Sequence, residues 1–132
     1  MWFLDTNACI MFTRGQAHVC ARWHQHHSDE IAIPMMVFGE LLVGSEKSSQ
    51  PERVSGEIEA LIERHALIGV TGEVARAYAR IRAGLEKRGT TIGENDLWIA
   101  ATALAHDATL VTNNTDEFSR VPGLKIEDWA QP

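Results

Sequence analysis

The amino-acid sequence predicts an α/β fold, a three-layer α/β/α sandwich around a short parallel sheet of four to five strands. Short apolar runs recur along the chain, and between them apolar residues repeat with helical spacing. Strands that alternate with helices pair in parallel, and helices then cover both faces of the sheet. No linker, repeat or low-complexity stretch divides the 132 residues, so we expect a single domain over residues 1–132.

The first half of the chain contains two apolar runs of the length expected for short buried strands. Trp2-Phe3-Leu4 is the first, and the run from Ile31 to Ile33, which Pro34 stops, is the second. Gly15 lies where the first helix should end. The expected elements are a strand at 2–4, helices at about 7–13 and 16–27, a strand at 31–33 and a helix at about 36–47.

The second half is dominated by helices with apolar faces. Val54, Ile58 and Leu61 follow the i, i+4, i+7 spacing of one helical face. The stretch DLWIAATALAH is apolar nearly all round, which predicts a central, buried helix at about 96–106. The expected elements are a helix that starts near Pro51, a strand at 66–70, a helix with the stripe Val74, Tyr78, Ile81 and Leu85 that Gly89 ends, the buried helix, a strand at 109–112 and a fifth strand in the LKI run at 124–126.

Composition limits the compartment in which the protein works. No apolar stretch approaches the roughly 18–20 residues that span a bilayer, so we expect no membrane partner. The run Trp2-Phe3-Leu4 already belongs to the fold and leaves no room for a signal peptide. Cys9 and Cys20 fit reduced, buried thiols. We therefore expect a cytoplasmic protein.

The stretch HVCARWHQHH brings several potential metal ligands close together in sequence. A structural zinc site needs a second compact pair of ligands, and Cys9 alone does not supply one. We therefore interpret the stretch as a polar helix face followed by a loop. Its potential ligands are His18, Cys20, His24, His26 and His27.

Acidic and amide side chains follow the predicted strands. Asp5 comes directly after the first strand, and Glu40 lies in the helix after the second. Asp96 opens the buried helix. Because sites in such sheets form outside the carboxyl ends of the strands, we expect these side chains to converge at one edge. The segment after the fourth strand adds Asn113, Asn114, Asp116 and Glu117.

Each of these residues also has an ordinary structural explanation. Asp5 or Asn7 could cap the first helix, Asn95 or Asp96 could cap the buried one, and TNNTDE could be a turn. A joint explanation is stronger, because clustered carboxylates repel each other unless a cation enters. Mg²⁺ is held by carboxylates, and it supports hydrolysis of phosphate esters. The pattern therefore indicates metal-dependent phosphodiester hydrolysis.

Four motifs in order along the chain, FLDTN, GELLVGSEKS, IGENDLWIAATA and LVTNNTDEFSRVPGLKIEDW, resemble the PIN-domain ribonucleases, and most closely the VapC toxins of bacterial VapBC toxin–antitoxin modules. The likeness covers nearly the whole chain and is weakest at about 17–28. It implies a PIN-like fold. It also implies that Asp5, Glu40 and Asp96 are the principal metal-site acids, with Mg²⁺ as the cofactor and Mn²⁺ as a substitute.

The chain departs from the full four-acid pattern of the family. The fourth acid, just after the fourth strand, corresponds here to Asn114, and Glu117 is the candidate replacement and a fourth catalytic residue. The resemblance makes Thr6, Asn7 and Thr112 supporting hydrogen-bonding residues. Glu94 is interpreted as a charge in the first turn of the buried helix.

The resemblance also implies partners and a substrate. It implies an endoribonuclease toxin that cuts RNA, with the anticodon loop of initiator tRNA as a candidate target, and thereby inhibits translation. It implies a homodimer, neutralised by a VapB-type antitoxin that alone contacts operator DNA.

The net charge of −6 does not exclude an RNA partner. Without the four candidate site acids, 14 acidic residues stand against 12 basic ones, which leaves −2. Arg82, at the border of the apolar stripe of its helix, is a candidate to reach an RNA phosphate. The acidic total predicts weak, salt-sensitive non-specific binding. The remaining bases of that helix are interpreted as a solvated face. They are Arg76, Arg80, Lys87 and Arg88.

Two other function classes stay open at the sequence level. An aspartyl-phosphate phosphatase or receiver-like protein would use Asp5 as the nucleophile. However, a phosphatase of this class needs a second acid two residues after the nucleophile, and this chain has Asn7 there. A receiver-like domain needs a lysine after a late strand, and Lys125, within the LKI run, fits that position poorly. A binding module that keeps the fold without catalysis is the other class, and the intact set of acids speaks against it.

Overall fold

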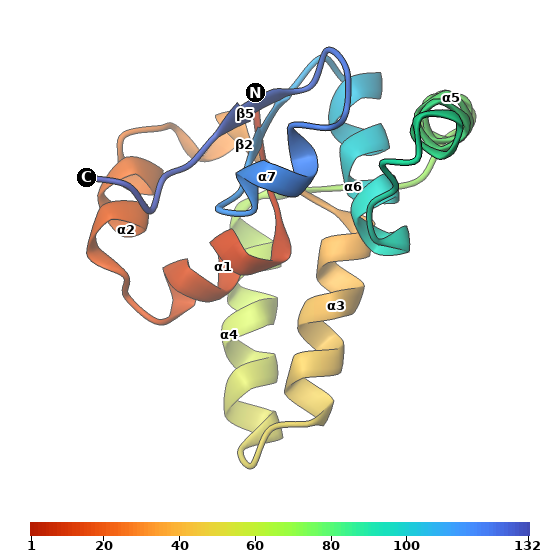
Figure 1. The fold of residues 1–132 in the computed structure, drawn as a ribbon. Coiled ribbons are helices and arrows are strands. Elements are labelled where there is room, and N and C mark those ends of the chain that lie inside the picture. The colour runs from red at the N-terminus through yellow and green to blue at the C-terminus, as the bar shows by residue number, and fades with distance from the viewer.

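Five short parallel strands form the centre of the molecule, in the order β3-β2-β1-β4-β5. A computed structural model describes all 132 residues (Figure 1). Both the α/β fold class and the parallel sheet are confirmed. The strands are β1 (Trp2–Leu4), β2 (Ile31–Pro34), β3 (Ala66–Ile68), β4 (Thr109–Val111) and β5 (Lys125–Glu127).

The strand order places the candidate acids at a defined crevice. The chain leaves β1 for its neighbour β2, and later returns to the other side of β1 as β4. In the register of the sheet Leu4 pairs with Val111, so β1 and β4 end side by side. Such a reversal of strand order opens a crevice at the carboxyl ends, where ligands of α/β sheets bind.

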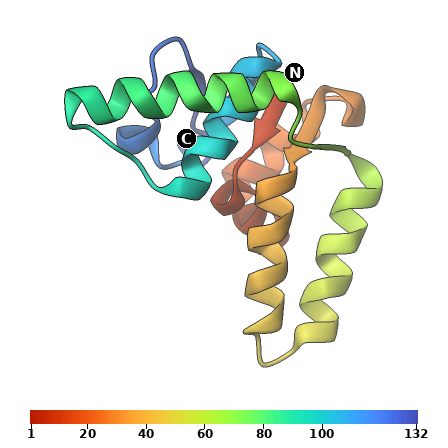
Figure 2. The same ribbon diagram turned by 90° about the vertical axis from the view of Figure 1, so that its right-hand side faces the viewer.

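Seven α-helices surround the sheet. Figure 2 shows α5 as one long helix lying across α6, while α3 and α4 project together as an antiparallel pair. None of the helices combines the length and the apolarity that crossing a bilayer requires. The helices are α1 (Thr6–Thr13), α2 (Ala17–His24), α3 (Met35–Glu46), α4 (Pro51–Arg64), α5 (Gly72–Arg88), α6 (Glu94–Ala105) and α7 (Thr115–Phe118).

One hydrophobic core holds these layers together. Helix α6 is its central helix, as predicted. Its residues Leu97, Ile99, Ala100, Ala101 and Ala103 are all buried. The stripe of α5 packs against it, and α5 ends where Gly89 adopts a left-handed conformation with φ +69°. The site acids are therefore carried by rigid elements.

Apart from shifts of one residue at several ends, five predictions about individual elements need correction. Helix α2 ends at His24 rather than near 27, and α6 begins at Glu94 rather than Asp96. Strand β3 stops at Ile68 because it pairs only as far as Pro34 of β2. A 3-10 turn at Ser28–Glu30, closed by the side chains of His27 and Glu30, was not predicted. The stretch TNNTDE is not only a turn, because its last residues begin α7.

Candidate active site

Asp5 leaves the end of β1 and caps helix α1. Its Oδ1 accepts a hydrogen bond from the backbone N–H of Ala8 at 2.8 Å, so the capping explanation is correct for Asp5. The side chain is nonetheless only 5% exposed, and the buried Thr112 at the end of β4 hydrogen-bonds to it. Capping fixes this carboxylate at the crevice between β1 and β4. Asn7 does not cap α1.

Glu40 reaches the same place from helix α3. The Thr6 hydroxyl donates a hydrogen bond to its Oε1 at 2.5 Å, and the Asn95 amide lies 3.5 Å from its Oε2. The side chain is half-buried and is not simply solvated on a helix surface. Glu40 therefore links the first turns of α1 and α6 to α3, as a carboxylate with both oxygens held.

Asp96 and Glu117 form the other half of the site. Asp96 is not the cap of α6: Gly93 occupies that position, with no side-chain cap, so the capping alternative is wrong for both Asn95 and Asp96. Asp96 hydrogen-bonds to Glu117. Glu117 in turn accepts bonds from the Gly93 N–H at 2.8 Å and from the Asn114 amide at 2.7 Å.

The supporting amides form a second set of contacts. The Asn114 N–H donates to the Thr112 hydroxyl at 2.9 Å, and the Asn7 amide lies 3.4 Å from Asn113 Oδ1. Sequence reasoning missed Asn95 and Gly93 as residues that hold site carboxylates. The first could have been suspected from its place next to Asp96, whereas a backbone donor such as Gly93 leaves no mark in the sequence.

Comparison with known proteins places this constellation in a family. The PIN domain model matches residues 2–124. The tRNA(fMet)-specific endonuclease VapC of Salmonella typhimurium is 36% identical over 129 residues, which are 97% of each chain. The chain belongs to the VapC family of PIN domains. Ribonuclease VapC2 of Rickettsia felis is 35% identical over 133 residues, 98% of each chain. In the structure of VapBC2 from Rickettsia felis bound to a promoter DNA fragment, one chain superposes with a TM-score of 0.91 at 34% identity, covering 97% of this chain and 98% of that one.

Burial and like charge shift the acid equilibria of this PIN domain. The pKa of Asp5 is raised from 3.8 to about 6, chiefly by burial and also by the charge of Glu40. The pKa of Asp96 is raised to about 7 by burial, by its hydrogen bond to Glu117 and by the charges of Glu117, Glu40 and Asp5. The Gly93 N–H lowers the pKa of Glu117. Within this pair, the opposite shifts of the two pKa values favour the proton on Asp96 over Glu117.

The donor set of the VapC-like site fits a hard divalent cation. Its donors are oxygens of carboxylates and amides, which Mg²⁺ prefers. The pKa values of Asp5 and Asp96 are raised because burial, and after it neighbouring carboxylates, disfavour their charged forms, which a cation would stabilise. No three His, Cys, Asp or Glu side chains stand close enough together to hold an ion in the present side-chain positions. Glu40 is held by Thr6 and Glu117 by Gly93, so binding an ion would require the carboxylates to turn toward it.

Arg82 and Glu94 belong to a separate cluster of contacts between α5 and the first turn of α6. The Tyr78 hydroxyl donates a hydrogen bond to Glu94, and Arg82 Nη1 lies 3.2 Å from Glu94 Oε2. Arg82 Nε also pairs with Glu86 at 2.8 Å. Glu94 lies in the first turn of α6, as predicted, and Tyr78 and Arg82 bind its carboxylate. Arg82 stays a candidate RNA contact, but a phosphate would have to compete with two carboxylates for it.

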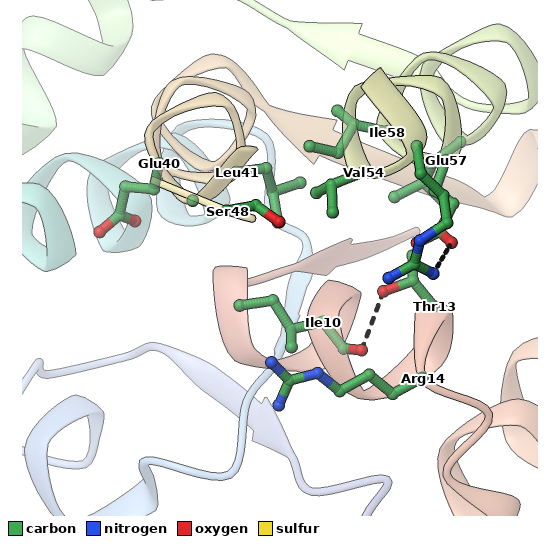
Figure 3. Close-up of a pocket in the computed structure, with 12 residues that line it drawn as sticks. Ile10, Thr13, Arg14, Glu40, Leu41, Ser48, Val54, Glu57 and Ile58 are labelled. Carbon is green, nitrogen blue, oxygen red and sulfur yellow. Dashed lines mark hydrogen bonds and ion pairs between the residues drawn. The ribbon is translucent and has the colours of Figure 1, made fainter. Parts of the chain in front are cut away.

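A groove of about 610 Å³ runs from the site between α1, α3 and α4. Figure 3 shows Glu40 at one end of the lining, with Thr13 and Glu57 at the other. Its apolar side chains belong to the facing helices, and Glu57 is paired with Arg53 at 3.1 Å. The groove therefore joins a site carboxylate to an apolar surface. The apolar lining residues are Ile10, Leu41, Val54, Ile58 and Leu61.

Proposed function

We propose that this protein is a metal-dependent endoribonuclease, the toxin of a toxin–antitoxin module, which hydrolyses RNA phosphodiester bonds and so inhibits translation. The observation that supports it most directly is the meeting of Asp5, Glu40, Asp96 and Glu117 at the β1–β4 crevice. These acids come from four segments far apart in sequence, and the curated relatives of the chain are VapC ribonucleases.

The cofactor we propose is Mg²⁺, with Mn²⁺ as a substitute. Asp5, Glu40 and Asp96 are the residues that would hold it, and Glu117 is the fourth catalytic acid. When bound, such an ion supplies positive charge to the scissile phosphate and lowers the pKa of the attacking water. Its positive charge would also lower the pKa of Asp96, so that the carboxylate form is available.

Other residues position three of these acids. The Ala8 N–H and Thr112 fix Asp5, Thr6 and Asn95 fix Glu40, and Asn114 fixes Glu117. Each contact restricts the rotation of a carboxylate before substrate arrives. The segments that carry the acids are therefore in place before substrate arrives, and only the carboxylate groups would have to turn toward an ion.

Cleavage of tRNA by the purified chain tests this proposal. We expect total tRNA to be cut in Mg²⁺ or Mn²⁺ and to stay intact in a chelator. Sequencing of the new RNA ends should then locate the bond, and a single cut in the initiator tRNA would match the specificity named for the Salmonella relative. Intact tRNA in both ions, or cleavage that a chelator does not stop, would contradict the proposal. Acid-labile phosphate on Asp5 would instead favour the aspartyl-phosphate class.

The partner we propose is a VapB-type antitoxin whose apolar segment lies in the α1–α3–α4 groove and covers Glu40. The apolar lining and the connection to Glu40 support this placement, and a similar structure is a VapBC complex. We further propose a homodimer, which sedimentation of the purified chain would test. Contact with operator DNA would come through the antitoxin alone.

A large side chain at Gly44 should weaken antitoxin binding. Gly44 lines the groove, and a Cβ built on it meets no atom within 4 Å, so the helix can accept Gly44→Phe while the new ring obstructs the groove. We expect affinity for the antitoxin of the neighbouring reading frame to fall by at least about 10-fold, a loss typical of one well-placed interface residue. Gly56→Phe on α4, equally open and outside the lining, is the control. Equal affinities for the two variants would place the antitoxin elsewhere.

A further inference from the structure

A second cavity, of about 350 Å³, lies on the opposite edge of the sheet from the acids. Ser28 precedes β2 and His65 precedes β3, so the cavity lies at the amino ends of these strands. The end of α1, helix α2 and the end of α4 complete its walls. The lining residues are Phe12, Trp23, His24, His26, Ser28, Arg64 and His65.

The walls of this cavity are largely aromatic. Phe12 stacks on Trp23 with ring centres 3.8 Å apart and planes at 21°. His26 stacks on Trp129 at 5.1 Å and 9°, and its other neighbour is Trp2 at 4.0 Å. Trp23 and Trp129 are buried, so these rings are fixed in place. His24 and His26 of HVCARWHQHH thus contribute to an aromatic wall, and no three of the potential ligands gather as a metal site.

His65 is held as one neutral tautomer. Its Nε2 accepts a hydrogen bond from the Trp23 indole N–H at 3.1 Å, and its Nδ1 lies 3.2 Å from the Ser28 carbonyl oxygen. Both ring nitrogens are therefore committed, and burial lowers the pKa of His65. His65 is a structural wall of the cavity and not a free metal ligand.

Arg64 gives the cavity its charge. The guanidinium is exposed at the end of α4 and makes no side-chain hydrogen bond or ion pair. No carboxylate lines this cavity, although the chain carries a net charge of −6. A free guanidinium offers paired N–H donors that match phosphate geometry. An anion can therefore enter here without meeting a like charge in the lining.

We propose that this cavity binds one nucleotide, with its phosphate on Arg64 and its base on the half-buried ring of Phe12, bordered by the edges of Trp23 and His26. Aromatic rings and imidazoles stack on unpaired bases, and arginine binds their phosphates, in single-stranded RNA recognition. The source is an RNA strand or a free nucleotide, and the RNA case rests on the proposed function.

A surface depression connects the two sites, and its lining carries Glu57 and Glu63 as well as Arg53 and Arg64. The cavity shares Phe12 and Arg64 with a neighbouring hollow of about 230 Å³. That hollow shares Thr13, Glu57 and Leu61 with the groove that ends at Glu40. A strand held at Arg64 can thus follow a continuous depression to the acids, along the path that we propose for the antitoxin. Antitoxin and RNA would then compete for the groove as well as for the site acids.

The test is a binding titration of the full chain in a chelator, where no metal-dependent cleavage occurs. Tryptophan fluorescence should change saturably on addition of adenosine monophosphate and of a single-stranded hexaribonucleotide. Arg64→Ala should raise the dissociation constant of both by about 10-fold. Arg53→Ala, which changes an exposed arginine already paired with Glu57 and outside the lining of this cavity, should leave the dissociation constant of the monophosphate unchanged. If the hexanucleotide displaces the monophosphate, the source is RNA, and if only the monophosphate binds, the source is the free nucleotide.

Three results would overturn the nucleotide site. They are the absence of binding for both probes, equal affinities for Arg64→Ala and the unchanged chain, or a loss of monophosphate affinity in Arg53→Ala equal to that in Arg64→Ala. Phe12→Leu, which keeps an apolar side chain, is a second variant and should weaken the monophosphate more than inorganic phosphate. Because these titrations measure binding and not cleavage, they test the nucleotide site even if the chain proves not to cut RNA. In a chain that does cut, Arg64→Ala should raise KM for tRNA and leave kcat unchanged.

Discussion

Asp96→Asn is expected to lower metal-dependent RNA cleavage by at least about 100-fold and to raise the melting temperature of the metal-free protein. The loss follows because an amide cannot replace the charge of a carboxylate toward a cation. The gain follows because burial, Glu117, Glu40 and Asp5 all disfavour an ionised Asp96. An Asn amide can still donate to Glu117, as the protonated Asp96 carboxyl does. At pH 8 the increase should be about 3 °C.

Melting curves in a chelator at pH 8 and initial cleavage rates in Mg²⁺ measure the two effects. Glu94→Gln is the matched control, because Glu94 lies in the same turn of α6 but contacts Tyr78 and Arg82. It should leave the cleavage rate within about two-fold. If Asp96→Asn melts at a lower temperature, the carboxylate stabilises the first turn of α6 more than its neighbours disfavour it.

The sequence predicts most of this fold because its central elements are buried. Apolar runs in the sequence predict the strands β1 and β2 and the helix α6, and the residues of these runs are buried in the core. The elements that were missed depend on a few local side-chain bonds. The 3-10 turn at Ser28–Glu30 is closed by His27, and α7 is a single turn of four residues. Neither carries an apolar repeat, so no periodicity marks them.

For the site, the sequence predicts residues better than contacts. Asp5, Glu40 and Asp96 follow from their places after strands and at helix starts, and the structure brings them into one electrostatic environment. The sequence does not predict the hydrogen bond between Asp96 and Glu117, because helix α7, which carries Glu117, was not predicted. The contacts that position Glu40 and Glu117 depend on side chains and backbone groups distant in sequence. Such contacts exist only once α1, α3 and α6 have packed.

Asp5 provides the second large effect, through a comparison of Asp5→Asn with Asp5→Ala. Both variants should lose at least about 100-fold in metal-dependent cleavage, because each removes a buried site carboxylate. They should differ in stability. Asn can still accept the Ala8 N–H and cap α1, whereas Ala leaves that donor without a partner, at a cost of about 1 kcal/mol. Chemical denaturation of the metal-free proteins at one pH measures this difference, and equal stability would mean that the cap contributes little.

The pH dependence of Asp5→Asn separates the charge of Asp5 from its role as a cap. Folding raises the pKa of Asp5 from 3.8 to about 6, so folding favours the protonated form. Below pH 3.8 Asp5 is protonated in both states and does not lower the free energy of unfolding. As pH rises through 6, the buried charge lowers the free energy of unfolding, by about 3 kcal/mol once pH exceeds 6. The metal-free protein should therefore lose stability between about pH 4 and pH 7, and Asp96 adds to the same trend at slightly higher pH. Asp5→Asn should flatten this decline, and saturating Mg²⁺ should oppose it, because an ion that binds the carboxylate form competes with the proton. If the metal-free protein and Asp5→Asn show the same slope in this window, burial does not disfavour the Asp5 charge, and the electrostatic argument for a cation at this crevice fails.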